Sequence, residues 1–180
     1  MMQKTLVLIK PDGVQRQLIG EIIKRFESSN LKVAGLKMLW PDKKLAEKHY
    51  PLDEEWALSV FKKSKESAEK ENRKFEFENH LEFGKNIQNR LVEFITESPV
   101  VAMVVQGENA IEQVRKITGA TEPKSSLPGT IRRDLAPEES YEKADKENRA
   151  IRNLIHASDS EENAEKEIKL WFSLNEMHEY

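Results

Sequence analysis

Four short stretches of the chain have the composition of β-strands. In the first and the third of them, apolar and β-branched residues follow one another with little of the polar alternation expected of a strand with one face in water, so these two are expected to be buried on both faces. The predicted strands are Thr5–Ile9, Leu31–Trp40, Val100–Val105 and Ile151–His156.

Proline and glycine delimit these strands. Pro11 has no backbone N–H for a β-ladder, so the first strand is expected to end before it and to place Lys10 at its tip. Gly35 is expected to mark a bulge in the second strand, and Gly107 to end the third.

Between the strands, apolar residues recur at the three- and four-residue spacing of helices. Gly119 is placed to cap the helix that begins at Asn109. Ser158 with Glu161, or Asp159 with Glu162, fits the N-cap pattern of the last helix. The predicted helices are Ile19–Phe26, residues 41–50, Ile87–Thr96, residues 109–117 and a last helix that runs to Phe172.

This order of elements predicts an α+β sandwich. A four-stranded antiparallel sheet of the split βαβ type, covered by helices, accommodates it. No repeat or linker divides the chain, so residues 1–180 are expected to form one domain.

Two charged stretches, at about residues 60–86 and 136–150, interrupt this order and are interpreted as helical insertions. Residues 62–78 are mostly Lys, Glu, Ser and Asn, and the apolar residues among them are few. We therefore expect a solvated helix or mobile hairpin without a core of its own. Residues 137–149 are expected to form a short helix.

Composition narrows the class of protein. The 180 residues include 29 basic and 32 acidic side chains, for a net charge of −3, which argues against a nucleic-acid partner. The chain has no cysteine, and the apolar run Leu6–Ile9 is too short for a signal peptide or a membrane span. We expect a soluble cytoplasmic protein.

The last predicted strand and helix contain the strongest candidate chemistry. Glu167 falls inside the apolar stripe formed by Ala164, Ile168 and Trp171, where a carboxylate needs a partner. His156 is the nearest candidate, because the following turn can fold the helix back beside it. A single histidine after a strand is more often structural, but this one precedes a turn rich in hydroxyl and backbone donors, at a helix N-terminus that favours anions.

Residues 153–160 and 164–172, Asn-Leu-Ile-His-Ala-Ser-Asp-Ser and Ala-Glu-Lys-Glu-Ile-Lys-Leu-Trp-Phe, closely resemble the active-site segment of nucleoside diphosphate kinases. Residues 10–16, Lys-Pro-Asp-Gly-Val-Gln-Arg, and the Pro-Gly-Thr-Ile-Arg of residues 128–132 resemble two further segments of this family. Ala157 stands where the family usually has glycine, and Arg133 replaces another glycine.

The resemblance implies a ferredoxin-like core and a ping-pong reaction. His156 would accept the γ-phosphate of a nucleoside triphosphate and pass it to a nucleoside diphosphate. Glu167 and Ser158 would orient the imidazole. The residues expected to hold the nucleotide are Lys10, Tyr50, Trp56, Arg115, Thr121, Arg132 and Asn153, with Trp56 as the candidate that stacks on the base.

The chain has no phosphate-binding P-loop and no kinase glycine-rich loop, so the cations Lys10, Arg115 and Arg132 would hold the triphosphate. Mg²⁺ would be bound through the nucleotide phosphates, without a protein metal site. The resemblance also implies a homo-oligomer, either a hexamer or a tetramer, and no membrane partner.

Two other interpretations stay open. One is a catalytically weak homologue that serves as an oligomeric interaction protein. The complete set of charged site residues argues against this interpretation. The other is a nucleic-acid-binding module, because RNA-recognition domains share the split βαβ core. The chain has neither the aromatic-rich strand nor the positive charge of such a module.

Overall fold

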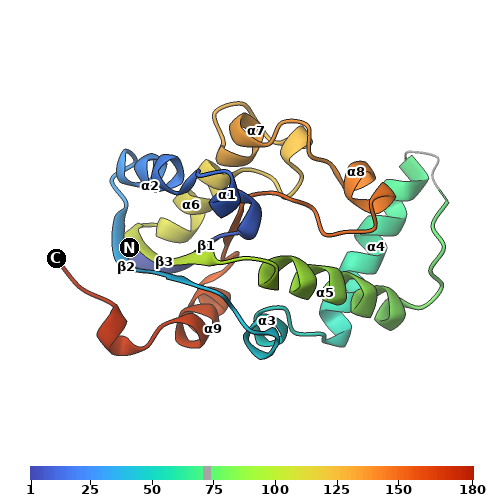
Figure 1. Cartoon of the computed structure of the whole chain (residues 1–180), viewed down its shortest axis with the longest axis horizontal. Coiled ribbons are helices and arrows are strands. Elements are labelled where there is room, and N and C mark those ends of the chain that lie inside the picture. The colour runs from blue at the N-terminus through green and yellow to red at the C-terminus, as the bar shows by residue number, and fades with distance from the viewer. Residues whose placement is uncertain (71–73) are drawn as a thin grey trace.

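A four-stranded antiparallel sheet lies at the centre of the protein (Figure 1). The computed structural model describes residues 1–70 and 74–180. The strands lie in the order β2-β3-β1-β4, and each hydrogen-bonded pair is antiparallel. This confirms the predicted α+β sheet. The strands are β1 (Met2–Ile9), β2 (Lys32–Leu39), β3 (Val100–Glu108) and β4 (Ile155–Ala157).

Helices cover the sheet. The α-helices are α1 (Pro11–Gln15), α2 (Ile19–Glu27), α3 (Lys43–His49), α4 (Glu54–Lys70), α5 (His80–Thr96), α6 (Ala110–Thr118), α7 (Ile131–Leu135), α8 (Tyr141–Lys146) and α9 (Glu161–Trp171), with short 3₁₀ turns at Pro123–Ser125 and Leu174–Glu176. Among the described residues, none of these helices is long and apolar enough to cross a membrane.

Strand β1 is buried on both faces, as its unbroken apolar run predicts. Val7 and Ile9 belong to a core cluster that includes apolar residues of α2 and α6. Leu6 and Leu8, which alternate with them, belong to a second cluster that includes residues of α3, α5 and α9. The sheet therefore separates two apolar layers, and the segment that follows β1 emerges from the middle of the molecule.

Two glycine predictions had opposite outcomes. The predicted bulge at Gly35 is confirmed by a shift in the β2–β3 register between Val33 and Gly35. The prediction that Gly107 ends the third strand was wrong, because β3 continues to Glu108 and Gly107 pairs with Gln3 of β1. A Cβ at Gly107 would lie 2.5 Å from a side-chain carbon of Leu31, so close packing requires this glycine.

The first insertion has more internal packing than its composition predicts. The rings of Phe61, Phe75, Phe77 and Phe83 form one cluster, in which Phe75 and Phe83 have centroids 5.2 Å apart. Ala68 is buried as well. The expectation of a segment without a core of its own was therefore wrong, because four aromatic rings hold α4 against the start of α5. The part of this prediction that concerns residues 71–73 lies outside the described residues.

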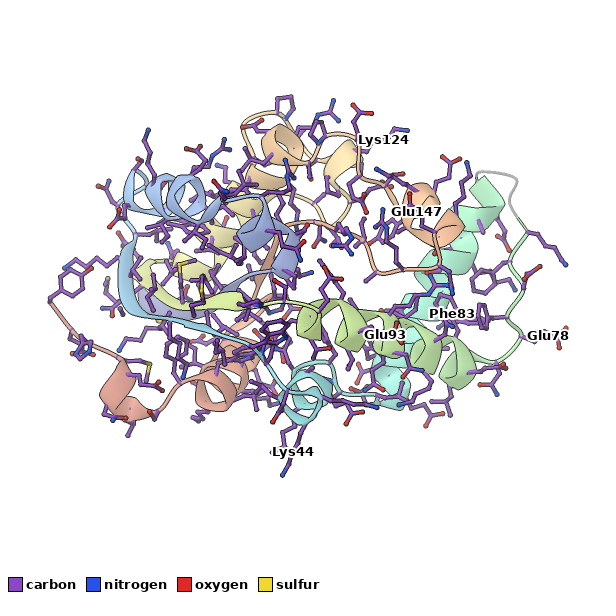
Figure 2. All side chains as sticks on the ribbon, in the orientation of Figure 1. Lys44, Glu78, Phe83, Glu93, Lys124 and Glu147 are labelled. Atoms are coloured by element: carbon purple, nitrogen blue, oxygen red, sulfur yellow. The ribbon has the colours of Figure 1, made fainter. Side chains whose placement is uncertain are left out.

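The second insertion forms the predicted short helix, α8, and contacts α5, the helix that follows the first insertion (Figures 1 and 2). Arg90 of α5 donates hydrogen bonds to Asp145 at 3.0 Å and to Asn148 at 2.8 Å. Arg149 forms a two-nitrogen ion pair with the buried carboxylate of Glu139. The second insertion is therefore held by an ion pair of its own and by hydrogen bonds to α5.

Candidate active site

A sharp turn before β4 positions the candidate nucleophile. Leu154 has a φ of 69°, and the amide of Ile155 donates to the carbonyl of Asn153 at 2.8 Å, as in a γ-turn with positive φ. The predicted strand Ile151–His156 was therefore too long, since β4 begins only at Ile155. This departure from a regular strand allows Asn153 and His156 to line the same cavity.

The segment that follows β1 holds this turn from both sides. The backbone N–H of Lys10 donates to the carbonyl of Leu154 at 2.8 Å, and the carboxylate of Asp12 accepts the Leu154 amide at 3.0 Å. Asp12 is buried, which raises the pKa of its carboxyl group, although the charge of Lys10 opposes this shift. Positive φ is costly for a side chain such as leucine, so these contacts keep Leu154 in place.

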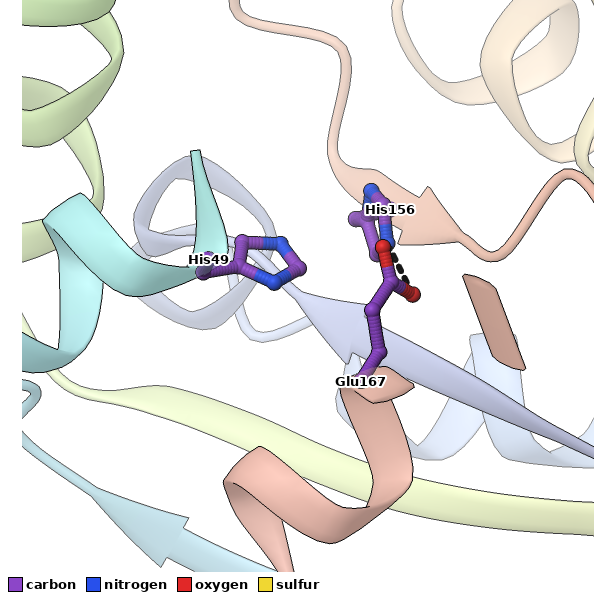
Figure 3. Close-up of side chains that lie close together, drawn as sticks. All are labelled: His49, His156 and Glu167. Carbon is purple, nitrogen blue, oxygen red and sulfur yellow. Dashed lines mark hydrogen bonds and ion pairs between the residues drawn. The ribbon is translucent and has the colours of Figure 1, made fainter. Parts of the chain in front are cut away.

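His156 and Ser158 share one oxygen of Glu167. The imidazole Nε2 lies 2.9 Å from Glu167 Oε2 (Figure 3). The Ser158 hydroxyl donates to the same oxygen at 2.6 Å. A carboxylate accepts hydrogen bonds, so a neutral His156 carries its proton on Nε2 and keeps a lone pair on Nδ1. Ser158 itself is fully buried and also accepts the Leu6 amide.

The N-cap of the helix that carries Glu167 lies two residues after one predicted cap, Ser158, and one residue after the other, Asp159. Ser160 is the N-cap residue of α9, and its hydroxyl accepts the Asn163 amide at 3.2 Å. Ser158 is not a cap because its hydroxyl is bonded to Glu167, and Asp159 binds the side-chain amide of Asn163. Both capping predictions were wrong, because Ser158 is bonded to Glu167 and Asp159 to the side chain of Asn163, which leaves Ser160 to cap the helix.

One cavity of about 1080 Å³ gathers the candidate residues. Ser158 lies behind Glu167 and does not line it. The predicted site residues that line the cavity are Lys10, Tyr50, Trp56, Arg115, Thr121, Arg132, Asn153, His156 and Glu167.

Lys10 lies at the buried end of this cavity. Its ammonium donates to the side-chain oxygen of Asn153 at 2.8 Å and lies 5.8 Å from the ring centroid of Phe94. Burial, and then the positive charge of Arg132, lower the pKa of Lys10 to about 7, and the charge of Asp12 opposes the shift. The side chain can therefore gain or lose its proton near neutral pH.

Arg132 is the most constrained cation of the site. Its guanidinium donates to the carbonyls of Gly119 at 3.0 Å and Ile155 at 2.7 Å, with a longer bond to Asn153. Burial lowers the pKa of this guanidinium to about 10, so it stays charged at neutral pH. These bonds hold both sides of the turn before His156, a structural role that sequence reasoning missed.

The remaining candidates form the outer part of the cavity. Arg115 and Thr121 are exposed, and the Thr121 carbonyl accepts the Asn153 amide at 2.8 Å. Tyr50 follows α3, and burial raises the pKa of its hydroxyl, which therefore stays protonated and able to donate. Trp56 is half-buried near the start of α4, so this helix contributes directly to the cavity wall.

Sequence reasoning also missed His49. Its ring lies 4.5 Å from that of His156, centroid to centroid, with the planes 83° apart (Figure 3). The indole N–H of Trp171 donates to His49 Nδ1 at 3.2 Å. In the sequence, only the position of His49 next to Tyr50, in the His-Tyr pair, could have indicated that this histidine belongs to the site.

Ligand atoms of His49, His156 and Glu167 lie within 4.8 Å of one another, which suggests a metal site. The tautomers argue against one. Because the Trp171 indole can only donate, the lone pair of His49 Nδ1 is engaged, and a neutral His49 carries its proton on Nε2. Neither nitrogen is then free to bind a metal ion.

A histidine with one free lone pair, oriented by a carboxylate in a cavity lined by several cationic side chains, is the site of a phosphotransferase. Residues 3–70 and 54–177 match the family model described as nucleoside diphosphate kinase, and the two matches overlap over α4. The chain belongs to the nucleoside diphosphate kinase family and transfers phosphoryl groups between nucleotides.

Curated relatives and solved structures agree with this assignment. A nucleoside diphosphate kinase of Pyrococcus horikoshii is 46% identical over 178 residues, which cover 99% of this chain and 90% of that protein. The crystal structure of an NDP kinase from Pyrobaculum aerophilum has a TM-score of 0.94 at 39% identity, covering 99% of this chain and 100% of that one. A nucleoside diphosphate kinase of Borrelia burgdorferi, described as a transition-state mimic with bound vanadate and ADP, has a TM-score of 0.82 at 41% identity, covering 99% of this chain and 92% of that one.

Proposed function

We propose that His156 is the nucleophile of a two-step exchange between nucleoside triphosphates and diphosphates. Nδ1 attacks the γ-phosphorus, the bond from that phosphorus to the β,γ-bridging oxygen breaks, and the nucleoside diphosphate leaves. A second nucleoside diphosphate then takes the group from Nδ1 and leaves as triphosphate. The observation that carries this proposal is the contact of 2.9 Å between His156 Nε2 and Glu167, which leaves Nδ1 as the free nucleophile.

The carboxylate of Glu167 stabilises the imidazolium that forms when Nδ1 becomes bonded to phosphorus. As positive charge develops on the ring, the Nε2–H···O hydrogen bond becomes charge-assisted and strengthens. Ser158 donates to the same Glu167 oxygen and holds the carboxylate in this orientation. Glu167 and Ser158 thus act through His156 and are positioning residues.

The triphosphate would lie between Lys10, Arg115 and Arg132. Phosphoryl transfer depends mainly on positioning and electrostatic stabilisation, which cationic side chains supply. Tyr50 and Thr121 would add hydroxyl donors, and Asn153 would contact the sugar or the phosphates. Arg132 already donates to three carbonyls, so its contribution to phosphate binding comes mainly from its charge.

Trp56 would stack on the nucleotide base at the entrance of the cavity. Its half-buried indole lies in the cavity wall on α4. Aromatic stacking tolerates every base, because each base has a π-face. This arrangement supports a broad range of acceptor nucleotides.

Mg²⁺ would enter with the nucleotide and neutralise its phosphates. Among the described residues, the one cluster of three potential metal ligands is built on two imidazoles, whereas Mg²⁺ prefers oxygen ligands. The phosphate oxygens would therefore supply the ligands from the substrate side, and the protein would supply the cations around them.

The proposal also includes one domain with two insertions, a cytoplasmic location and a homo-oligomer. Supporting the oligomer, Leu36, Met38 and Trp40 are exposed on the same face of β2, an edge strand of the sheet. Exposed apolar side chains on an edge strand favour association with a second copy. Whether a tetramer or a hexamer results is measured by sedimentation.

The test is incorporation of the labelled γ-phosphate of ATP into the purified protein. We expect one acid-labile, base-stable phosphoryl group per chain, which is released when a nucleoside diphosphate is added. His156→Ala should abolish incorporation, and His178→Gln, which changes an exposed histidine, is the matched control. A stable oligomer without incorporation would instead support the interaction protein, and incorporation by His156→Ala would rule out this nucleophile.

A further inference from the structure

His49 has a buried nitrogen that nothing in the described protein satisfies. The side chain is 6% exposed, and its Nε2 has no hydrogen-bond partner among residues 1–70 and 74–180. A buried N–H without an acceptor costs about 1–3 kcal/mol, so such groups are rare unless a ligand completes them. His49 also lines the cavity that holds His156.

The hydrogen bond from Trp171 determines which nitrogen of His49 carries the proton. An indole N–H can only donate, so His49 Nδ1 must accept. Burial, and then the positive charges that His156 and Lys10 can carry, hold the pKa of His49 well below its ordinary value, so the ring is neutral. A neutral ring with an accepting Nδ1 has its proton on Nε2.

This N–H belongs to an edge that faces the nucleophile. Figure 3 shows the nitrogen-bearing edge of His49 turned toward the His156 ring, and the ring centroids are 4.5 Å apart with nearly perpendicular planes. An oxygen of a phosphoryl group bonded to His156 can reach a donor at this separation. Trp171 also contacts the His49 ring, at a centroid distance of 5.5 Å, and its hydrogen bond to Nδ1 fixes the orientation of that ring.

We propose that the Nε2–H of His49 donates a hydrogen bond to an oxygen of the phosphoryl group as it is transferred to and carried by His156. The inference rests on the proposed function. His49 would be a further catalytic residue: a neutral, fixed donor that transfers no proton and needs no reorganisation when negative charge arrives. Lys10 and the arginines supply positive charge. His49 supplies a hydrogen-bond donor of fixed orientation, because Trp171 sets its tautomer and ring plane.

Two substitutions separate donation from packing. The amide of a glutamine can place an N–H near the position of Nε2, whereas leucine has similar bulk and no donor. We expect His49→Leu to slow phosphorylation of His156 by ATP in single-turnover measurements by roughly 10- to 100-fold, the value of a hydrogen bond to a charged group. His49→Gln should recover most of that loss. Urea unfolding of both variants reports any change in stability separately.

A spectroscopic measurement tests the donor without kinetics. With ¹⁵N-labelled histidine, the unliganded wild-type protein should show His49 protonated at Nε2, and addition of ADP with vanadate should shift that N–H and protect it from exchange. In Trp171→Phe the indole donor is gone, so we expect a mixture of both His49 tautomers.

Several outcomes would overturn the inference alone. These are equal phosphorylation rates for His49→Leu and His49→Gln, or a wild-type His49 protonated at Nδ1, while His156 still takes up phosphate. A wild-type protein that never incorporates phosphate from ATP would overturn the proposed function and the role of His49 with it. Slow phosphorylation of the leucine variant, with rescue by glutamine, supports both.

Discussion

The backbone amide of Leu154 donates a hydrogen bond of 3.0 Å to the carboxylate of Asp12, which lies 142 residues earlier in the chain. This bond joins the segment after β1 to the γ-turn before β4, and therefore joins Lys10 to His156. Because Leu154 has a φ of 69°, the turn would not be stable without such outside contacts.

Removing the acceptor of this bond should destabilise the protein and lower its activity. In Asp12→Ala the buried Leu154 amide loses its partner, which costs about 1–3 kcal/mol. Asp12→Asn is the matched control, since an asparagine oxygen can still accept the bond and should retain most of the stability. Urea unfolding gives the free energies, and equal losses in the two variants would show that the negative charge of Asp12 matters more than its hydrogen bond.

Lys10 should make the protein less stable at low pH. Its folded-state pKa of about 7 lies below the ordinary 10.5, so the unfolded chain binds the extra proton between these values. The loss of folding stability caused by the buried charge of Lys10 is greatest below pH 7 and decreases as the pH rises. Lys10→Met removes this charge, so its gain in stability over wild type should be about 2–3 kcal/mol larger at pH 6 than at pH 9. The variant should also be inactive, because the site loses one of its cations. A gain that is the same at both pH values would contradict this prediction.

Arg115 and Arg132 should respond differently to truncation. Arg115 is exposed, so Arg115→Ala should raise the KM for nucleotide by roughly tenfold or more with little change in unfolding, by loss of one charge-assisted contact. Arg132→Ala leaves three backbone carbonyls without their donor, so it should lower the thermal midpoint as well as kcat. Differential scanning calorimetry and steady-state kinetics distinguish them. Equal thermal midpoints for the two variants would contradict this prediction.

Trp56 should control base binding rather than chemistry. Trp56→Leu removes base stacking of about 1–3 kcal/mol and should raise KM about tenfold or more with all bases, while kcat at saturation changes little. Trp40→Leu, at an exposed tryptophan after β2, is the control and should keep the wild-type KM. A wild-type KM in Trp56→Leu would remove this residue from the site.

The first insertion should support nucleotide binding through its aromatic cluster. Replacing residues 63–79 by a short Gly/Ser loop removes Phe75 and Phe77, which contact Phe61 of α4 and Phe83 of α5. We expect α4 to lose its place in the cavity wall and KM to rise strongly, while His156 is still phosphorylated at high ATP. An unchanged KM would mean that the cavity does not need α4.

The sheet was predictable because its two central strands contain unbroken apolar runs, Leu6–Ile9 in β1 and Val100–Val105 in β3. The sequence could not show that Gly107 lies inside β3, because the reason is the packing of Leu31 from another segment. The same holds for Ser158: its neighbours suggest a helix cap, whereas its hydroxyl is committed to Glu167. Local patterns fail where a residue distant in sequence supplies the stronger partner.

The site was predicted from two kinds of signal, and each had a limit. Glu167 was identified physically, since a carboxylate in an apolar stripe requires a partner, and that partner is His156. Most of the nucleotide-binding candidates came from family resemblance, and they line one cavity with His156. Neither the apolar pattern nor the family resemblance identified His49, because a buried donor without an acceptor is recognised only when the surrounding atoms are known.

Arg90 reaches from α5 to both Asp145 and Asn148, and so joins α5 to the second insertion although 55 and 58 residues separate these partners along the chain. This contact has an evolutionary consequence. The second insertion and an arginine at this position of α5 are expected to be inherited together: a lineage that lost the insertion would remove both acceptors, and another side chain could then replace the arginine.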